Sequence, residues 1–310
     1  MAQPSPPEAP DRPKVVYVMG SGRSGSTILG IALGNCEDFF YAGELDNWLT
    51  RAGTPALGGS ERTRFWSRVG EQVEGAEDLF GGESHRSLER SGSVFRIHRW
   101  RARRRLRPRY RQVTEGLYRA IAHTAGVTHV VDTAHFPLRA RELRGIEGID
   151  LYLVFLVRDP QSVVASFARN VNRHDAAARR RLAFTTNADL WLTHLLSAIV
   201  FLRHRRDRRM FLRHEDFLAD PEGALRDILD RLDSPAAVPD LTSLSTGLPF
   251  RGNRLIGSDV VALQAQAERP VGGSRLTALL QLPWRAVFPR MRPAVTASSP
   301  REPVAAGQPR

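Results

Sequence analysis

The sequence predicts an α/β fold of three layers, with a central, mostly parallel β-sheet between helices. Apolar runs of strand length alternate along the chain with longer runs of helical periodicity. The most hydrophobic run, LYLVFLV at 151–157, lacks polar alternation, which is typical of a central parallel strand buried on both faces. Glycine-rich and polar motifs begin where these strands end, so a ligand site is expected at the carboxyl edge of the sheet.

Each expected element rests on its local pattern. Strands are short apolar runs rich in β-branched and aromatic residues, and they are expected at 14–19, 39–42, 128–132, 151–157 and 209–213. Helices follow apolar periodicity or a proline at the first turn, and they are expected at 28–33, 46–51, 62–74, 113–125, 138–143, 161–170, 188–203 and 221–232. The glycine- and charge-rich residues 75–92 are expected to be a mobile insertion, the pattern weakens beyond 240, and we find no internal repeat.

Composition favours one domain with short disordered ends. A chain of 310 residues with 42% hydrophobic content is large enough for one sizeable α/β core. Residues 1–13 and 294–310 are predicted to be disordered, which leaves 14–293 as the domain. Cys36 is the single cysteine, so an internal disulfide and a cysteine-based zinc site are excluded. We see no signal peptide and no apolar run of membrane-spanning length, and therefore expect a cytoplasmic protein.

The charge is strongly basic, at +12, and arginine supplies nearly all of it. A nucleic-acid partner is one explanation; anionic substrates and an arginine-rich codon bias are two others, which we favour together. The stretch RIHRWRARRRLRPRYR at 96–111 holds nine arginines with Trp100 and Tyr110 among them. A lid on the substrate side is the preferred interpretation. A solvated helix face, or contact with nucleic acid or an anionic membrane, stays open.

The first strand ends in a glycine-rich turn, GSGRSGST at 20–27, and a helix follows. In this order, backbone N–H groups and the helix dipole form an anion site. The spacing of Gly20 and Gly25 is that of a nucleoside-triphosphate loop, but Ser26 stands where lysine should be and the nearest cation is Arg23. Because a triphosphate site needs that lysine beside magnesium, this loop better suits one phosphate that carries another anionic group.

The segment Gly22 to Thr27 resembles the 5′-phosphosulfate loop of sulfotransferases, which use 3′-phosphoadenosine 5′-phosphosulfate (PAPS) as donor. A second segment, LVRDP at 156–160, resembles the 3′-phosphate-binding segment of that family, in which a strand ends in arginine and the next helix presents a serine. Here Arg158 is suited to grip a phosphate bidentately, and Ser166 lies about two helical turns further on. The resemblance implies the P-loop-NTPase-like sulfotransferase fold.

Two shorter segments match the same family. LRHEDF at 212–217 resembles a strand end usually written arginine–tyrosine–glutamate–aspartate, with His214 in place of the tyrosine that commonly lies by the adenine. FRGNR at 250–254 resembles the late basic segment that closes over the 3′-phosphate. The likeness is weakest at 52–112 and 170–210, which are expected to be variable insertions on the acceptor side. The implied donor-binding residues are Gly22, Arg23, Ser24, Gly25, Ser26, Thr27, Arg158, Ser166, His214, Gly252, Asn253 and Arg254.

The implied reaction is in-line attack of an acceptor hydroxyl or amine on sulfur, with Arg23 stabilising the leaving phosphate. Glu44 is the first candidate for the general base, because AGEL at 42–45 resembles the glutamate-base segment of carbohydrate and bacterial sulfotransferases. His135 is the second candidate. It ends DTAH at 132–135, where bacterial relatives have Asp-Ser-Ser-Lys, so it could replace the lysine charge, act as the base or simply pack. The family requires no metal, and none is expected.

Other functions remain open at this point. A P-loop kinase or NTPase would need a lysine at position 26, and a basic nucleic-acid-binding protein would leave the glycine-rich loop, Arg158 and Ser166 without a purpose. A catalytically silent relative that only binds nucleotide is a further alternative. The expected acceptor is a small molecule, a carbohydrate or a glycolipid. No nucleic-acid partner is expected, peripheral membrane contact is compatible with the sequence, and the sequence does not predict an oligomeric state.

Overall fold

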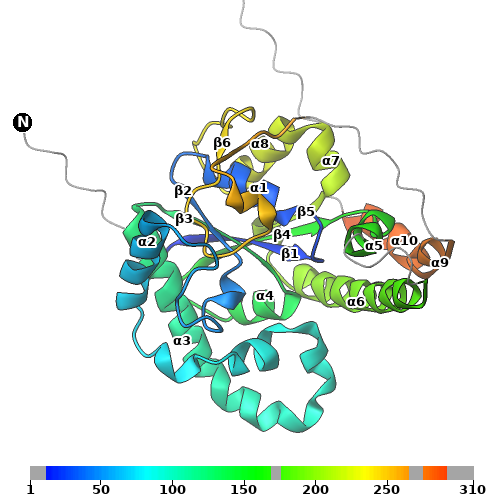
Figure 1. The fold of residues 1–310 in the computed structure, drawn as a ribbon, viewed down its shortest axis with the longest axis horizontal. Helices are drawn as coiled ribbons and strands as arrows, with labels where there is room; N and C mark the ends of the chain where they lie inside the picture. The colour runs from blue at the N-terminus through cyan, green and yellow to red at the C-terminus, as the bar shows by residue number, and fades with distance from the viewer. Residues whose placement is uncertain (1–11, 169–175, 265–274, 292–310) are drawn as a thin grey trace, which may run out of the picture.

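A computed structural model describes residues 12–168, 176–264 and 275–291. Five parallel strands form one sheet in the order β2-β3-β1-β4-β5 (Figure 1), which confirms the predicted fold class. The strands are β1 (Lys14–Gly20), β2 (Phe39–Gly43), β3 (His129–His135), β4 (Asp150–Val157) and β5 (Arg209–Arg213). The expected tail at 294–310 and all but two residues of the expected leader lie outside the described residues.

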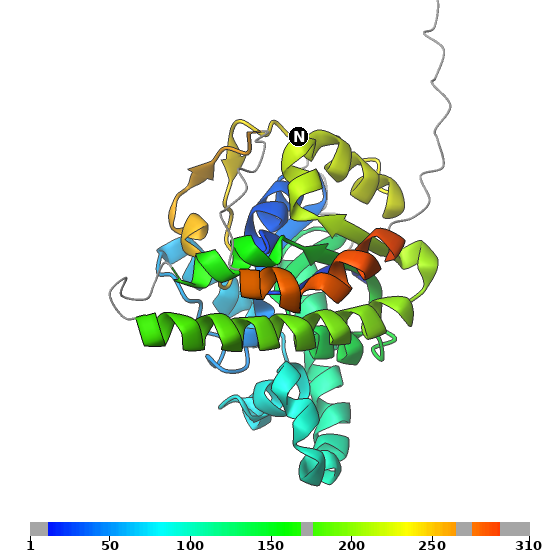
Figure 2. The ribbon, with the colours of Figure 1, turned by 90° about the vertical axis from the view of Figure 1, so that its right-hand side faces the viewer.

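Helices cover both faces of the sheet, because β1 is apolar on both sides. Val15, Tyr17 and Met19 belong to one core cluster, and Val16 and Val18 belong to the other, as the two-residue period of a strand requires. The first face carries α2 (Ser60–Glu71), α3 (Trp100–Ala125), α4 (Pro137–Leu143), α6 (Ala176–Leu202) and α10 (Leu282–Met291); the second carries α1 (Ser26–Gly34), α7 (His214–Ala219), α8 (Pro221–Arg231) and the hairpin of β6 (Leu244–Ser245) with β7 (Val260–Val261). Figure 2 shows α5 (Pro160–Ala168) and α9 (Arg275–Leu280) beside α6.

The strand order creates a switch point between β1 and β4. From β1 the chain runs through α1 to β2, on the β3 side, whereas from β4 it runs through α5 and α6 to β5 on the opposite side. The two strands are hydrogen-bonded neighbours, with Gly20 paired with Leu156 at the last position of the ladder. Ligands of open α/β sheets bind where neighbouring connections diverge in this way.

Several expected elements differ from the observed ones. In place of a helix at 46–51 there is one 3₁₀ turn, η1 (Leu45–Asn47), because Ala52 and Gly53 adopt positive φ and turn the chain. Residues 75–92 are not a mobile insertion but a packed series of turns, among them η2 (Glu77–Leu79), η3 (His85–Glu89) and η4 (Ser91–Phe95). A further turn, η5 (Ile97–Arg99), leads into α3, which includes most of the arginine stretch, and α6 begins before the expected 188.

A buried ion network fixes the unexpected turns to the sheet. Arg139 of α4 is 2% exposed, and its guanidinium lies 2.5 Å from Glu89 Oε1 and 3.2 Å from Asp132 Oδ2. Tyr118 donates to the same Asp132 oxygen at 2.6 Å, and Tyr110 donates to Glu89. A buried charge that loses its partner is strongly destabilising, so η3, α3, β3 and α4 are held as a unit.

The same network shapes the carboxyl end of β3. The second oxygen of Asp132 accepts a hydrogen bond from the Ala134 N–H at 2.8 Å and a longer one, at 3.5 Å, from the Leu45 N–H. Asp132 therefore joins the residue that follows Glu44 to the strand that ends in His135. The two candidate bases of the sequence analysis come to lie on either side of one buried carboxylate.

We predict that Arg139→Met lowers the free energy of unfolding by about 3–5 kcal/mol, because it leaves Asp132 and Glu89 buried without their cation. Urea unfolding followed by circular dichroism measures this change. Arg119→Met is the matched control: Arg119 is half exposed and pairs with Glu115 on the surface of α3, so its loss should cost less than about 1 kcal/mol. Equal effects of the two substitutions would contradict the assigned role of Arg139.

Candidate functional site

A cleft of about 870 Å³ opens at the carboxyl edge of the sheet, above the β1–β4 switch point. It gathers segments that lie more than 200 residues apart in the chain, from the loop after β1 to the turn after Phe250. All but one of the residues that the sequence implicated line it: Gly22, Arg23, Gly25, Ser26, Thr27, Glu44, His135, Arg158, Ser166, His214, Gly252, Asn253 and Arg254. Its wall also includes Ile28, Phe167, Arg251 and Leu255.

Ser24 is the implicated residue that does not line the cleft. Its side chain is 1% exposed and donates a hydrogen bond to the Ser21 carbonyl oxygen. The hydroxyl of Ser24 therefore closes the turn from within, and it does not face a ligand. The hydroxyl residues that the cleft offers on this loop are Ser26 and Thr27.

The loop after β1 has the backbone of an anion site. Arg23 and Gly25 both adopt positive φ, +68° and +91°, and such alternation turns successive N–H groups toward one side. Gly25 is the N-cap of α1, and no side chain in the described part of the chain caps that terminus. The first N–H groups of α1 are therefore open to a bound anion, which the helix dipole favours.

Glycine is required at position 25 for a second reason. A β-carbon there would lie 2.3 Å from Nδ1 of His214, whose buried ring packs against the loop. His214 is the first residue of α7, where the family resemblance expects a tyrosine. In this chain, His214 packs against the glycine-rich loop at Gly25 and also lines the cleft.

Arg158 reaches the loop from the neighbouring strand. It follows β4 directly, and its Nη1 donates to the carbonyl oxygen of Arg23 at 3.4 Å. The adjacent Asp159 caps α5 by accepting from the Ser162 N–H at 3.0 Å, and this helix carries Ser166 into the cleft. The Arg158 guanidinium thus reaches the backbone of the loop that carries Arg23, and both arginines line the cleft.

Glu215 is a residue whose role the sequence analysis missed. Its Oε1 accepts from the Asp159 N–H at 2.6 Å, which joins the start of α7 to the turn that holds Arg158. Glu215 stands two residues after the end of β5, but its contact with the distant Asp159 N–H could not be predicted from that position. Phe167 was missed as well; the Arg23 guanidinium lies 5.8 Å from its ring centroid, within the range of a cation–π contact.

Glu44 lies at the end of β2 against the segment that follows Phe250. Its N–H donates to the Arg251 carbonyl oxygen at 2.8 Å, and its Oε2 lies 3.6 Å from Arg251 Nε. Gly43 permits this approach, since a β-carbon there would be 2.2 Å from the same carbonyl oxygen. Burial raises the pKa of Glu44, and the guanidinium groups of Arg251 and Arg23 offset part of that rise. A carboxylate with a raised pKa is a better proton acceptor than an ordinary one.

His135 ends β3 with a positive φ of +57°. Burial lowers its pKa to about 4, so the imidazole is neutral at neutral pH. His135 therefore does not supply the positive charge of the lysine that bacterial relatives carry at this position. The neutral imidazole can donate or accept a hydrogen bond with a ligand, since His135 lines this cleft and also a second cavity next to it.

A second cavity of about 450 Å³ adjoins the first and shares Gly22, His135 and Phe167 with it. Its outer wall comes from the turns η3 and η4 and from α6. The residues of that wall include Arg86, Arg90, Ser91, Ser93, Arg96, Asp189 and Thr193. The site therefore has two compartments, one built on strand ends and one on the packed turns.

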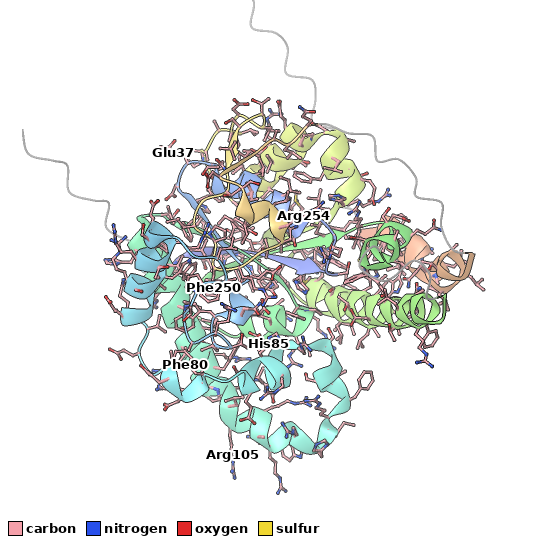
Figure 3. The ribbon with its side chains drawn as sticks, viewed as in Figure 1. Glu37, Phe80, His85, Arg105, Phe250 and Arg254 are labelled. Carbon is pink, nitrogen blue, oxygen red and sulfur yellow. The ribbon has the colours of Figure 1, made fainter. Side chains whose placement is uncertain are left out.

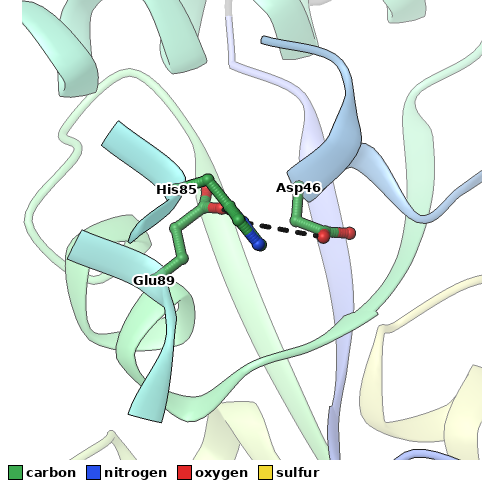
Figure 4. Close-up of side chains that lie close together, drawn as sticks. All are labelled: Asp46, His85 and Glu89. Atoms are coloured by element: carbon green, nitrogen blue, oxygen red, sulfur yellow. Dashed lines mark hydrogen bonds and ion pairs between the residues drawn. The ribbon is translucent and has the colours of Figure 1, made fainter. Parts of the chain in front are cut away.

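Asp46, His85 and Glu89 form the one group among the described residues with the spacing of metal ligands (Figure 4). His85 Nδ1 lies 2.7 Å from Glu89 Oε2 and 3.7 Å from Asp46 Oδ2. Its other nitrogen accepts from Arg90 Nε at 3.2 Å, and Glu89 also binds Arg139. Asn47 donates to Asp46 Oδ2, whereas Asp46 Oδ1 is buried without a hydrogen-bond partner among the described residues. Because Arg90 and Arg139 bind two of its three members, we interpret the group as an extension of the ion network.

Comparisons with known proteins agree with this geometry. A protein-family model described as "Sulfotransferase family" matches residues 13–238. The sulfotransferase domain of the curacin biosynthetic pathway is 15% identical, with a TM-score of 0.50 over 88% of this chain and 98% of that one. The sulfotransferase domain of the olefin synthase of Synechococcus PCC 7002 is 17% identical, with a TM-score of 0.51 over 90% and 98%. A search of curated proteins finds no match.

We predict that Gly25→Ala lowers the free energy of unfolding by about 1–3 kcal/mol, because it combines a left-handed backbone with a clash against His214. Gly70→Ala is the control. Gly70 lies inside α2 with open space around its would-be β-carbon, so alanine should stabilise the protein by up to about 1 kcal/mol. Guanidinium unfolding of both variants measures the difference. A neutral effect of Gly25→Ala would contradict the described loop.

We predict that Glu44→Gln is at least as stable as the wild type at pH 7. The folded state raises the pKa of Glu44 above its ordinary value of 4.5, so ionising this carboxyl costs stability as the pH rises through that range. The advantage of the variant should disappear near pH 4, where both side chains are uncharged. Unfolding at both pH values tests this, with the exposed Glu74→Gln as control. A wild type that is clearly more stable at pH 7 would refute it.

Proposed function

The chain belongs to the sulfotransferase family, and we propose that it moves the sulfuryl group of PAPS to a hydroxyl or amine of an acceptor. The observation that carries the proposal is the contact between Arg158 and the loop of Arg23 across the β1–β4 switch point. This contact puts two anion-binding positions side by side, as a nucleotide with a 5′-phosphosulfate and a 3′-phosphate demands. A nucleotide with one phosphate group has no use for the second position.

In this proposal, each end of the donor has its own set of side chains. The N–H groups after Gly25, with Arg23, Ser26 and Thr27, bind the 5′-phosphosulfate. Arg158 and Ser166 bind the 3′-phosphate together with the turn 252–254, whose Asn253 caps its own 3₁₀ turn by accepting from the Leu255 N–H. The cleft of about 870 Å³ has room for a nucleotide of this size.

The reaction proceeds by displacement at sulfur. The acceptor oxygen or nitrogen forms a bond to sulfur while the bond from sulfur to the bridging phosphate oxygen breaks, and 3′,5′-phosphoadenosine leaves. Glu44 takes the acceptor proton, a step worth about 10²–10⁴ in rate. Arg23 and the loop N–H groups neutralise the charge that develops on the leaving phosphate. Neutral His135 donates or accepts a hydrogen bond at the boundary between the two cavities.

The second cavity is the place for the acceptor in this proposal, because it meets the donor cleft at His135 and Gly22. Arg86, Arg90 and Arg96 on its outer wall favour an acceptor that already carries negative charge, whether a small molecule, a carbohydrate or a glycolipid. Among the described helices none is long and apolar enough to cross a membrane. We propose the cytoplasm as the location, which suits the free thiol of Cys36.

Calorimetric titration with 3′,5′-phosphoadenosine in metal-free buffer tests the donor site. We predict binding to the wild type, and affinity lower by about 10- to 100-fold in both Arg23→Ala and Arg158→Ala, because each removes charge-assisted hydrogen bonds worth about 1.5–3 kcal/mol. Arg64→Ala, on the exposed surface of α2, is the control and should bind as the wild type does. A preference for magnesium–ATP would replace this proposal with the kinase or NTPase alternative.

A further inference from the structure

One exposed segment of the chain combines apolar and cationic side chains and plays no part in the donor site. It comprises residues 95–105, which we call the arginine tip: the end of η4, the turn η5 and the first turns of α3. In Figures 1 and 2 this part of the chain forms the lower extremity of the molecule. Figure 3 shows Arg105 at that extremity, far from Arg254 of the donor cleft.

Three large apolar side chains of the tip face solvent. Phe95 is 73% exposed, Ile97 is 75% exposed and Trp100 is 51% exposed. Single exposed apolar residues are common on soluble proteins, but three within six positions concentrate exposed apolar side chains in one short segment, as interaction surfaces do. Phe95, Ile97 and Trp100 lie in η4, in η5 and at the first position of α3. Their spacing does not follow the period of one helix face that packs on the core.

The tip is also cationic without local compensation. Residues 90–114 contain no aspartate or glutamate. Further along α3, Arg107 and Arg111 pair with Glu142, and Arg109 pairs with Asp78. In the tip, by contrast, no acidic side chain among the described residues pairs with any of four exposed arginines, which are Arg99, Arg101, Arg104 and Arg105.

Arginines and aromatic side chains intermixed at one surface suit the interface of an anionic bilayer. Guanidinium groups bind lipid phosphates, and tryptophan, isoleucine and phenylalanine enter the boundary between headgroups and acyl chains. The Arg101 guanidinium lies 5.6 Å from the Trp100 ring centroid, so one lipid headgroup could contact both the cation and the aromatic ring. Nucleic acid would use the arginines and could stack on Trp100, but it offers little to an exposed aliphatic side chain such as Ile97. The composition of the tip therefore favours lipid.

We propose that the arginine tip docks the protein on the surface of a membrane that contains anionic phospholipids. The tip adjoins the second cavity, since Arg96 and Ser93 line it. Docking would bring the outer wall of that cavity to the headgroup layer. If the proposed function holds, an amphiphilic acceptor anchored in the same membrane could then reach the site; the docking itself does not depend on the proposed function.

Co-sedimentation of the full chain with vesicles tests the proposal. We expect binding to vesicles of phosphatidylcholine with about one third phosphatidylglycerol, little binding to pure phosphatidylcholine, and weakening at high salt. A variant with Arg99, Arg101, Arg104 and Arg105 all changed to Gln should lose about 100-fold or more in affinity, since one arginine near an anionic surface contributes about fivefold. A variant with Ile97→Ser and Trp100→Ser should lose roughly tenfold at unchanged charge.

Matched controls separate docking from general basicity and from the donor site. The pair Arg64→Gln and Arg68→Gln removes exposed arginines of α2, and Leu202→Ser removes an exposed apolar side chain of α6; both should leave vesicle binding unchanged. Equal losses in the controls, no loss in the serine variant, or binding of single-stranded RNA by the tip without binding of vesicles would overturn the proposal. Because vesicle binding requires no nucleotide, it remains interpretable even if 3′,5′-phosphoadenosine does not bind.

Discussion

The site depends on how closely β1 and β4 end together. Gly20 and Leu156 are paired at the last position of their ladder, and a β-carbon at Gly20 would lie 2.1 Å from the Leu156 carbonyl oxygen. Only glycine allows the two backbones to keep this register to the very end of the strand. Because of it, the loop of Arg23 and the turn of Arg158 leave the sheet at the same level. Both proposed anion positions depend on that one close approach.

The sequence was most informative where chemistry is attached to a strand end. The carboxyl ends of parallel strands lie at one edge of the sheet. Gly25, Glu44, His135 and Arg158 follow such ends, so the sequence alone was enough to assign them to one cleft. Burial then separated alternatives that the sequence had left open for His135, whose lowered pKa leaves it uncharged. Ser24 shows the limit of the local pattern: Ser24 and Ser26 belong to one motif, but the hydroxyl of Ser24 is buried against the Ser21 carbonyl oxygen, which depends on the turn itself.

The segment 75–92 could not be predicted because its anchor is distant in the sequence. Its glycines and charges have the composition of a mobile insertion, but Glu89 lies in the core against Arg139, fifty residues further on. A prediction from the local sequence includes Glu89 but not its distant partner Arg139. The same holds for the contact of Glu215 with a backbone N–H in another connection. Arginine content is equally ambiguous, since Arg139 is buried, Arg107 lies at a rim and Arg101 lies in solvent.

The two compartments of the site are built in different ways. Backbone geometry forms much of the cleft at the strand ends, and glycines with close neighbours at positions 20, 25 and 43 tolerate little change. Exposed arginines form the outer wall of the second cavity, on turns whose attachment depends on one interior carboxylate, Glu89. Substitutions of Arg86 or Arg96 would therefore alter the wall without disturbing the core, whereas Arg90 also donates to His85 of the ion network. Under the proposed function, such a division would let a lineage change the acceptors it modifies while the binding of the nucleotide donor stays constant.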